Sequence, residues 1–403
     1  MGRSTYIFGH LSLMAITFFF SLIAAHELGP KQMGQWQTVL LISSYAPILY
    51  LGVVNGLGRD IPYRLGKKAS VTEPTAIASK LILSLVSILA LGIPAVSYIL
   101  NRDPSFLIVA IVALSAGRII NVFSTILLRS HQRFVRLGYH QLTSAVVLTI
   151  FMLILIWAPS LRVLAIGMML AYVVPVVFSI SLWSLEAAPL SAGIKLVRIG
   201  FPIYLAGLIF SLLNSVDRWL ILLFMDKETL GLYTLAIMAF GVVIIVPSLL
   251  STIVYPKLAF SYGENHSIKD LIPTIRRVIV LNTTLTVAIA GIGFIAMYFF
   301  VIPMFLPEYL YGRDAMAIIF LSSLVLPVGQ SFGDLLNVIG MQNYYLRNIS
   351  FGFVLNMAVG ITLLKTTSLG INGVAIGTVT GLSAFSAAQY ITYRNSVLKN
   401  FVR

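Results

Sequence analysis

The sequence predicts an all-α polytopic membrane protein with about twelve transmembrane helices in two six-helix lobes. Three observations predict this fold. Of the 403 residues, 59% are hydrophobic and only 10% are charged, with a mean hydropathy of +0.96; a soluble domain carries about 25% charged residues. The apolar residues gather in runs of roughly 20, the length of a helix that spans a bilayer. A repeat offset by nearly half the chain predicts the two lobes.

The apolar runs define the predicted spans in chain order. The first is too long for the apolar core of a signal peptide and lacks a clear cleavage context, so we interpret it as a retained helix. The spans are 5–25, 35–58, 76–99, 106–128, 139–158, 162–184, 200–224, 230–254, 275–300, 315–338, 345–364 and 370–393. Several contain a proline, which we expect to kink the helix rather than end it, because neighbouring helices can satisfy the freed backbone groups. These prolines are Pro47, Pro94, Pro175, Pro202, Pro247 and Pro327.

The distribution of Lys and Arg predicts the orientation. Of 27 such residues, 18 fall at the N-terminus, in every second joint and at the C-terminus, and three fall within spans. The six on the opposite side are Lys31, Arg102, Arg162, Lys227, Arg313 and Lys365. Because cytoplasmic joints carry the excess of positive charge, we expect a protein of the cytoplasmic (inner) cell membrane with both termini in the cytoplasm. The net charge of +14 follows from this topology, and no nucleic-acid motif accompanies it.

A repeat relates the second and eighth predicted spans. An offset of about 197 residues pairs Gly34 with Gly231, Trp36 with Tyr233, and Gly66 with Gly263. Six spans per half is an even number, so the halves insert the same way up and are related by a pseudo-two-fold axis along the membrane normal. The mildly polar connector Ser184–Pro202 predicts the boundary between an N-terminal lobe, 1–190, and a C-terminal lobe, 191–403. Two such lobes imply a transporter with a central cavity and alternating access.

Charged residues within the spans are the main site candidates, because intramembrane charges are costly and usually face a cavity, a partner or a pathway. Arg118 lies mid-span and is interpreted as lining the cavity or as pairing with another helix. Asp217 and Arg218 are consecutive and point about 100° apart on a helix, so the acid either couples an ion or neutralises a neighbour. Asp334 is a candidate cation or proton site, or an inter-helix tie. Arg59 ends the second span, where snorkelling also explains it.

Two asparagines complete the candidates. Asn121 and Asn214 can hydrogen-bond sugar hydroxyls, although such residues also link helices. The predicted substrate-binding residues are thus Arg118, Arg218, Arg59, Asn214 and Asn121, and the predicted ion-coupling or pairing residues are Asp217 and Asp334.

Enzyme chemistry finds little support in the sequence. There is no cysteine, and the five histidines have no metal-ligand spacing. No phosphate-binding glycine loop is present. We therefore expect a transporter with neither cofactor nor metal, driven by an ion gradient, the membrane potential or a substrate gradient.

Several segments resemble one family. They are "ELGPKQMGQWQ", "RSHQRF", "NSVDRWLILLF" followed by "ETLGLYTLA", "FLPEYLYGRDAMAII" and "LGINGVAIGTVTGL". Over essentially the whole chain, the sequence resembles the O-antigen and exopolysaccharide repeat-unit flippases of the multidrug/oligosaccharidyl-lipid/polysaccharide exporter superfamily. The resemblance implies twelve helices in two bundles and a polyprenyl-pyrophosphate-linked oligosaccharide as cargo. It also implies contact with membrane lipids and with a polysaccharide polymerase and its chain-length machinery.

An anionic lipid-linked glycan as cargo agrees with the charged residues within the spans. An anionic lipid-linked glycan needs a cationic cavity, and arginine offers a planar fork that fits phosphate oxygens. The spans hold three bases (Lys80, Arg118 and Arg218) against two acids (Asp217 and Asp334). Two alternatives share the fold: a cation-coupled multidrug exporter, which would favour acids, and a lipid II flippase, which usually carries two further helices, whereas we find none after Tyr393. A third alternative is a non-transporting partner in a polysaccharide-synthesis complex.

Overall fold

All regular structure in the described part of the chain is helical. The computed structural model describes residues 2–100, 105–265 and 268–398, and none of them lies in a β-strand. The predicted all-α fold is therefore confirmed. Arg102, one of the six cations assigned to the outer side, lies outside the described residues.

The chain divides into two compact units, Met1–Gly207 (unit 1) and Leu208–Arg403 (unit 2). The division falls inside helix α7 (Leu190–Leu213), whereas the predicted boundary between 190 and 191 stands at its start. The first part of α7 belongs to unit 1 because it packs tightly there. Gly200 lies so close to Gly52 and Gly56 that a Cβ atom at Gly200 would clash with their backbone.

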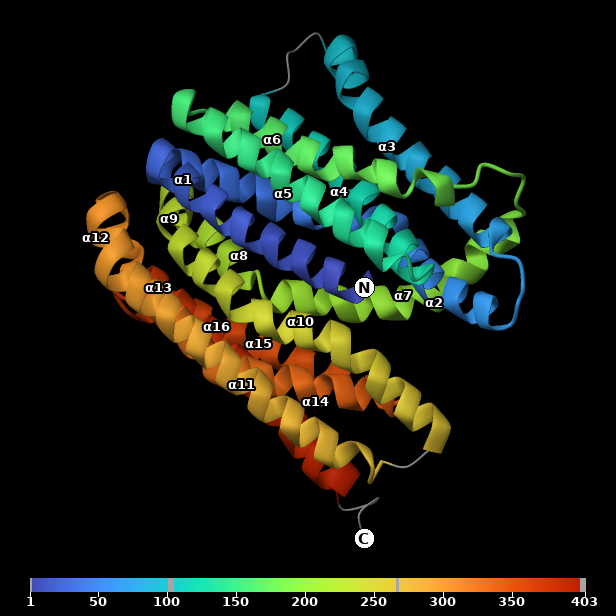
Figure 1. Ribbon diagram of the computed structural model, residues 1–403. Coiled ribbons are helices and arrows are strands. Elements are labelled where there is room, and N and C mark those ends of the chain that lie inside the picture. Colours follow the sequence, from blue (N-terminus) through green and yellow to red (C-terminus); the bar gives the residue numbers. More distant parts are fainter. Residues whose placement is uncertain (1, 101–104, 266–267, 399–403) are drawn as a thin grey trace. The chain divides into compact units, whose positions relative to one another are not determined.

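Unit 1 contains the first predicted lobe (Figure 1). Contacts join α4 to α1, α3 and α6, and α5 to α1 and α6. Its elements before α7 are α1 (Gly2–Ser44), the 3₁₀ turn η1 (Ala46–Tyr50), α2 (Val53–Gly66), α3 (Thr72–Leu100), α4 (Phe106–Ser130), α5 (Phe134–Trp157), α6 (Leu161–Val173) and the 3₁₀ turns η2 (Val174–Phe178) and η3 (Ile180–Leu182).

The first two predicted spans are joined without a loop. Within α1, two helices meet across a kink at Gly29, which leaves helical geometry with φ 69° and ψ 172°. Glycine tolerates this positive φ because it lacks a Cβ atom. The second predicted span is interrupted, since α1 ends at Ser44 and α2 begins only at Val53.

The expectation that the prolines kink rather than end the helices is wrong for three of them. Pro47 lies in η1, Pro175 lies in η2 just after α6 ends, and Pro327 lies in the first turn of α14. A proline lacks the N–H that would continue the helix and clashes with the preceding turn. By contrast, Pro202 lies inside α7 and Pro247 lies within α10, as expected.

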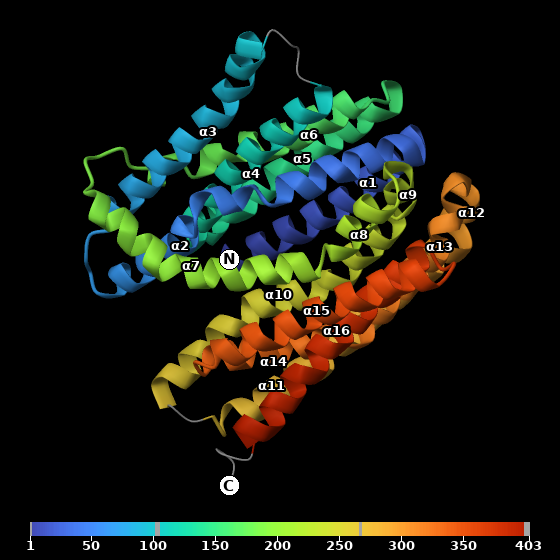
Figure 2. The same ribbon diagram turned by 180° about the vertical axis from the view of Figure 1, so that it is seen from behind.

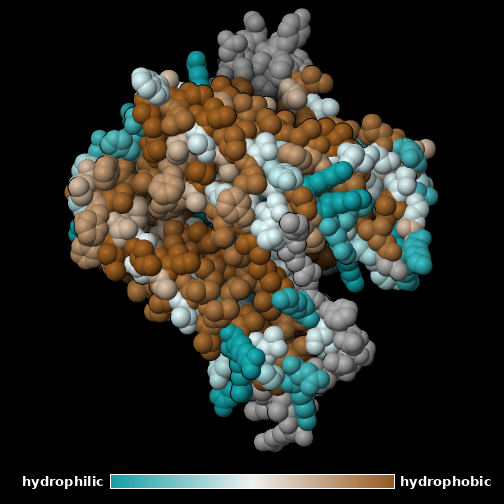
Figure 3. Space-filling model, viewed as in Figure 1, coloured by the Kyte–Doolittle hydropathy of each residue, from teal (hydrophilic) through white to brown (hydrophobic). Residues whose placement is uncertain are grey.

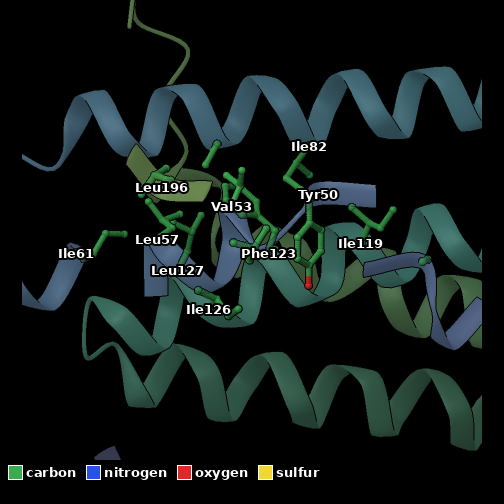
Figure 4. Packing of buried hydrophobic residues seen from close by; sticks show 13 residues of the cluster. Tyr50, Val53, Leu57, Ile61, Ile82, Ile119, Phe123, Ile126, Leu127 and Leu196 are labelled. Atoms are coloured by element: carbon green, nitrogen blue, oxygen red, sulfur yellow. The ribbon is translucent and has the colours of Figure 1, made fainter. Parts of the chain in front are cut away.

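The interruption between α1 and α2 is packed by a core of aliphatic and aromatic side chains from four helices (Figure 4). Tyr50 and Leu57 lie against Ile82 of α3 and Phe123 of α4, and Leu196 of α7 completes the cluster. These side chains are almost wholly buried. In lipid, close van der Waals packing of this kind holds helices together, so this core fixes α2 and the start of α7 against α4.

Unit 2 contains the second predicted lobe, and its helices are interrupted more often. Its elements after α7 are α8 (Val216–Phe224), α9 (Lys227–Leu232), α10 (Thr234–Asn265), α11 (Leu271–Ile295), the π-helical turn η4 (Ala296–Val301), α12 (Ile302–Phe305), the 3₁₀ turn η5 (Pro307–Gly312), α13 (Arg313–Phe320), the 3₁₀ turn η6 (Leu321–Leu324), α14 (Leu326–Val338), α15 (Gln342–Thr366), α16 (Ile371–Thr392) and the π-helical turn η7 (Tyr393–Leu398).

Corresponding helices of the two units have corresponding neighbours. In unit 1, α4 contacts α3 and α6, while α5 contacts α6. In unit 2, α14 contacts α11 and α16, while α15 contacts α16, and Figure 2 shows this group of helices from behind. The aromatic residues paired by the sequence repeat, Trp36 and Tyr233, are both buried. Each unit therefore builds a similar helical neighbourhood from its own half of the chain.

The lengths and surfaces of the helices are those of a multi-span membrane protein. Ten described helices are long and apolar enough to cross a membrane, or eleven if the pair Pro307–Leu324 and Leu326–Val338, bent by 43°, is one span. The first, Ser4–Tyr50, has 47 residues, or roughly 70 Å at 1.5 Å per residue. It is long enough for the first two predicted spans, because a hydrocarbon core is about 30 Å thick. Hydrophobic residues cover most of the face in Figure 3.

Candidate functional site

Arg118 of α4 is held by an uncharged residue. Its Nη2 donates a hydrogen bond to the hydroxyl of Tyr172, at 3.0 Å, and its Cζ lies 5.6 Å from the centre of that ring. Both side chains are partly buried. Among the described residues, the ion pairs are Asp60–Arg64 and Asp217–Arg218, so Arg118 has no acidic partner there.

Tyr172 lies where α6 ends, and polar side chains from two other helices secure its backbone. Pro175 has no N–H to donate to the carbonyl of Ala171, four residues earlier. The hydroxyl of Ser144 in α5 donates to that carbonyl instead, at 2.9 Å. In α4, the Nδ2 of Asn121 donates to the carbonyl of Tyr172, at 3.0 Å. The helix end thus has hydrogen-bond partners without water.

The structure therefore brings Arg118 and Asn121 together on Tyr172. One N–H of the Asn121 amide is used on a backbone carbonyl, which is the helix-linking role that the sequence left open. Arg59 lies elsewhere in unit 1, on α2, with an exposed side chain. Its neighbour Asp60 is buried and binds Arg64, with Nε and Oδ2 2.6 Å apart.

In unit 2, Asp217 and Arg218 lie at the break between α7 and α8. The Nη2 of Arg218 donates to the carbonyl of Asn214 at the end of α7, at 3.0 Å. Asp217 lies in the first turn of α8, and its Oδ1 is 3.7 Å from the Nε of Arg218. The guanidinium of Arg218 thus lies at the C-terminus of α7, which attracts cations, and the carboxylate of Asp217 lies at the N-terminus of α8, which attracts anions.

The carboxylate of Asp217 is enclosed by further hydrogen bonds. The hydroxyl of Tyr233, which has no exposed surface, donates to its Oδ2 at 3.0 Å, and the backbone N–H of Arg218 donates to its Oδ1 at 2.7 Å. This carboxylate is therefore fixed by Arg218 of α8 and by Tyr233, which lies between α9 and α10.

Asparagine side chains also lie at this break. The Nδ2 of Asn356 in α15 donates to the carbonyl of Leu213, at 3.2 Å. The Oδ1 atoms of Asn356 and Asn214 are buried and accept no hydrogen bond. Two amide oxygens with free lone pairs thus belong to residues at the same helix break as Asp217.

Asp334 lies in α14, apart from this break. No ion pair forms at Asp334 within the described ranges. A buried amide network lies on the neighbouring helices, where the Nδ2 of Asn348 donates to Gln389 and to Thr392, both at 3.0 Å. No hydrogen bond joins Asp334 to Asp217 among the described residues.

Sequence reasoning missed Tyr172, Ser144, Tyr233 and Asn356 as parts of these sites. A tyrosine or serine in an apolar run carries little signal alone, but two local patterns did contain information. Tyr172 is three residues before Pro175, where carbonyls lose their partners, and Tyr233 is the repeat partner of Trp36. Within the described residues, no group of three or more His, Asp or Glu side chains can hold a metal ion.

Comparison with known proteins supports the fold. No protein family and no curated protein matches the sequence. Among solved structures, an inward-facing multidrug resistance MATE family transporter of the MOP superfamily matches with a TM-score of 0.64 and 17% identity, over 100% of this chain and 96% of that chain. The outward-facing conformation of such a transporter matches with a TM-score of 0.64 and 18% identity, over 99% and 97%.

A flippase structure is similar to the same extent. The lipid II flippase MurJ, in an inward closed conformation, matches with a TM-score of 0.66 and 12% identity, over 98% of this chain and 89% of that chain. The chain therefore has the fold that these MATE and MurJ structures share. At these identities the likeness establishes the fold, and the cargo has to be argued from the chain's own residues.

Proposed function

We propose that the protein is a flippase that carries a polyprenyl-pyrophosphate-linked oligosaccharide across the cytoplasmic membrane by alternating access. The fold supports transport in general, because solved structures that share it include a multidrug transporter and a lipid II flippase. The single observation that supports the cargo class is Arg118. It is a cation within an apolar helix, and a tyrosine hydroxyl is its hydrogen-bond partner in the described part of the chain.

The free energy of a buried charge makes this observation informative. A cation at the centre of a bilayer costs at least about 2.5–3.5 kcal/mol, and a structural arginine is expected to recover this through an acid. A hydroxyl does not neutralise Arg118, and the predicted spans of the first lobe contain Lys80 but no Asp or Glu. An anionic cargo would supply the missing charge, and the guanidinium has further N–H donors for phosphate oxygens.

Asp217 is the proposed site of the coupling cation. A cation needs oxygen ligands, and broken helices supply them in transporters. Asp217 offers a buried carboxylate, and Asn214 and Asn356 offer amide oxygens that accept no hydrogen bond. Arg218 neutralises Asp217 in the absence of the cation, as the ion pair indicates.

One observation favours a second function. Asp334 is an acid within an apolar helix with no ion pair in the described ranges, and an exporter of cationic compounds would use such a group. A multidrug exporter is therefore the alternative, and it predicts that Asp334, rather than Arg118, controls transport.

The experiment compares glycan export in cells whose own flippase has been deleted. Arg118→Ala is expected to reduce export at least about tenfold, because it removes the charge and the hydrogen-bond donors together. Arg118→Lys keeps the charge but loses the planar fork, so we expect partial activity. Arg162→Ala is the matched control, because Arg162 is exposed and we expect normal export.

Membrane abundance is measured for every variant. Wild-type export by Arg118→Ala at normal abundance would contradict the proposal, whereas low abundance would identify Arg118 as a structural residue. Resistance to lipophilic cationic dyes, lost in Asp334→Asn but kept in Arg118→Ala, would support the multidrug exporter. Rescue of cells depleted of their lipid II flippase would indicate lipid II as the cargo.

A further inference from the structure

The hydroxyl of Tyr172 has an unused donor. Its oxygen accepts the hydrogen bond from Arg118 at 3.0 Å, and a tyrosine hydroxyl can accept and donate at the same time. No acceptor for its proton is found among the described residues. Arg118 likewise keeps N–H donors beyond the one that it gives to Tyr172. Two residues from different helices thus present donors side by side at one place in unit 1.

Side chains of α4 and α5 secure the backbone at Tyr172. Asn121 binds its carbonyl and Ser144 binds the carbonyl of the preceding residue. Asn121 is three residues after Arg118 on α4, so both project toward the end of α6. The backbone of Tyr172 is therefore fixed, while the residue as a whole is only partly buried.

We propose that Tyr172 binds the cargo directly, donating its hydroxyl hydrogen to an oxygen of the same diphosphate that Arg118 binds. This inference rests on the proposed function and adds a residue to its binding site. An oxygen of a diphosphate is a strong acceptor, and hydrogen bonds to an ionised acceptor are about twice as strong as neutral ones. Asn121 is then a positioning residue, which acts through the backbone of Tyr172.

The test measures binding of geranylgeranyl diphosphate, a short polyprenyl diphosphate, to the full-length protein in lipid nanodiscs. Geranylgeraniol, which has no phosphate, reports binding of the hydrocarbon tail alone. Tyr172→Phe is expected to weaken diphosphate binding about tenfold, because it removes one charge-assisted hydrogen bond. Geranylgeraniol binding is expected to stay unchanged. The matched control is Tyr139→Phe on α5, an exposed tyrosine whose ring stacks on Phe178, with no change expected.

A double-mutant cycle, together with the melting temperature of the ligand-free protein, tests whether Tyr172 and Arg118 act on the same diphosphate. If both donors bind one diphosphate, Tyr172→Phe should cost less than about twofold when Arg118→Gln is already present, because contacting residues are not additive. Full additivity, accompanied by a lower melting temperature of ligand-free Tyr172→Phe, would overturn the proposal in favour of a structural tyrosine.

The remaining outcomes distinguish this inference from the proposed function. Wild-type diphosphate binding by Tyr172→Phe, together with weak binding by Arg118→Gln, would overturn the role of Tyr172 and leave the proposed function standing. Equal binding of geranylgeranyl diphosphate and geranylgeraniol by the wild type would remove the support for both.

Discussion

At the scale of single residues, the charges within the spans have two kinds of environment. Arg118 is held by a neutral hydroxyl, whereas Arg218 is held by Asp217 and by the carbonyl of Asn214. The first arrangement leaves a net positive charge in an apolar helix, and the second leaves none. Arg118 therefore remains the stronger candidate for contact with an anion, and the Asp217–Arg218 pair fits coupling or stabilisation.

This difference predicts the outcome of removing one charge from the pair. Asp217→Asn leaves Arg218 without its acid and should lower the free energy of unfolding by about 3 kcal/mol, measured as a lower melting temperature in detergent. Adding Arg218→Gln should restore much of this stability, because the charge is then balanced again. Glu228→Gln, at an exposed acid, is the control. A stable Asp217→Asn protein would show that the pair contributes nothing to folding.

The sequence identified the charged residues within the spans but not the residues that hydrogen-bond them, for a physical reason. A charge in an apolar run is conspicuous because it is costly. Tyr172 and Asn356 are ordinary residues whose partners lie 54 and 143 positions away in the chain. Such pairings depend on how helices pack, and the pattern of one segment does not contain that information.

At the scale of elements, the interruptions of the helices are secured by side chains of neighbouring helices. Ser144 and Asn121 satisfy the end of α6, and Asn356 satisfies the end of α7. Ser386 of α16 donates to the carbonyl of Val325, where α14 begins, at 2.9 Å. Hydropathy predicted where the spans lie but not these interruptions, because the side chains that satisfy the freed carbonyls come from other helices.

The interruption at Pro175 can be tested by exchanging the hydrogen-bond donor. Ser144→Ala leaves the carbonyl of Ala171 without a partner and should destabilise the protein by about 1–2 kcal/mol. Pro175→Ala supplies a backbone N–H, so the double variant should recover stability. Thr149→Ala is the control, because that hydroxyl binds a carbonyl of its own helix. The measurement is the melting temperature of each variant. A double variant no more stable than Ser144→Ala would refute this account of the break.

At the scale of the whole molecule, the two-lobe fold was predictable because the repeat and the even number of spans are properties of the entire sequence. The division itself falls inside α7, since Leu196 is buried in the core of unit 1. The polar connector Ser184–Pro202 predicted a boundary between 190 and 191, whereas the division depends on where the helix packs. The orientation in the membrane follows from charge alone and is a separate prediction.

The orientation predicts which exposed positions react with a membrane-impermeant thiol reagent in intact cells. Cysteines at Lys31, Lys227 or Lys365 should react from outside, because these joints belong to the side with few cations. Cysteines at Lys67 or Lys269 should react only after the cells are opened. All five side chains are exposed in the structure, so failure to react reports the membrane rather than burial in the protein. The chain has no native cysteine, and therefore every signal comes from the introduced residue. The reverse labelling pattern would place both termini outside. The joints rich in Lys and Arg would then face the outside, and the proposed cargo would move away from the side with few cations.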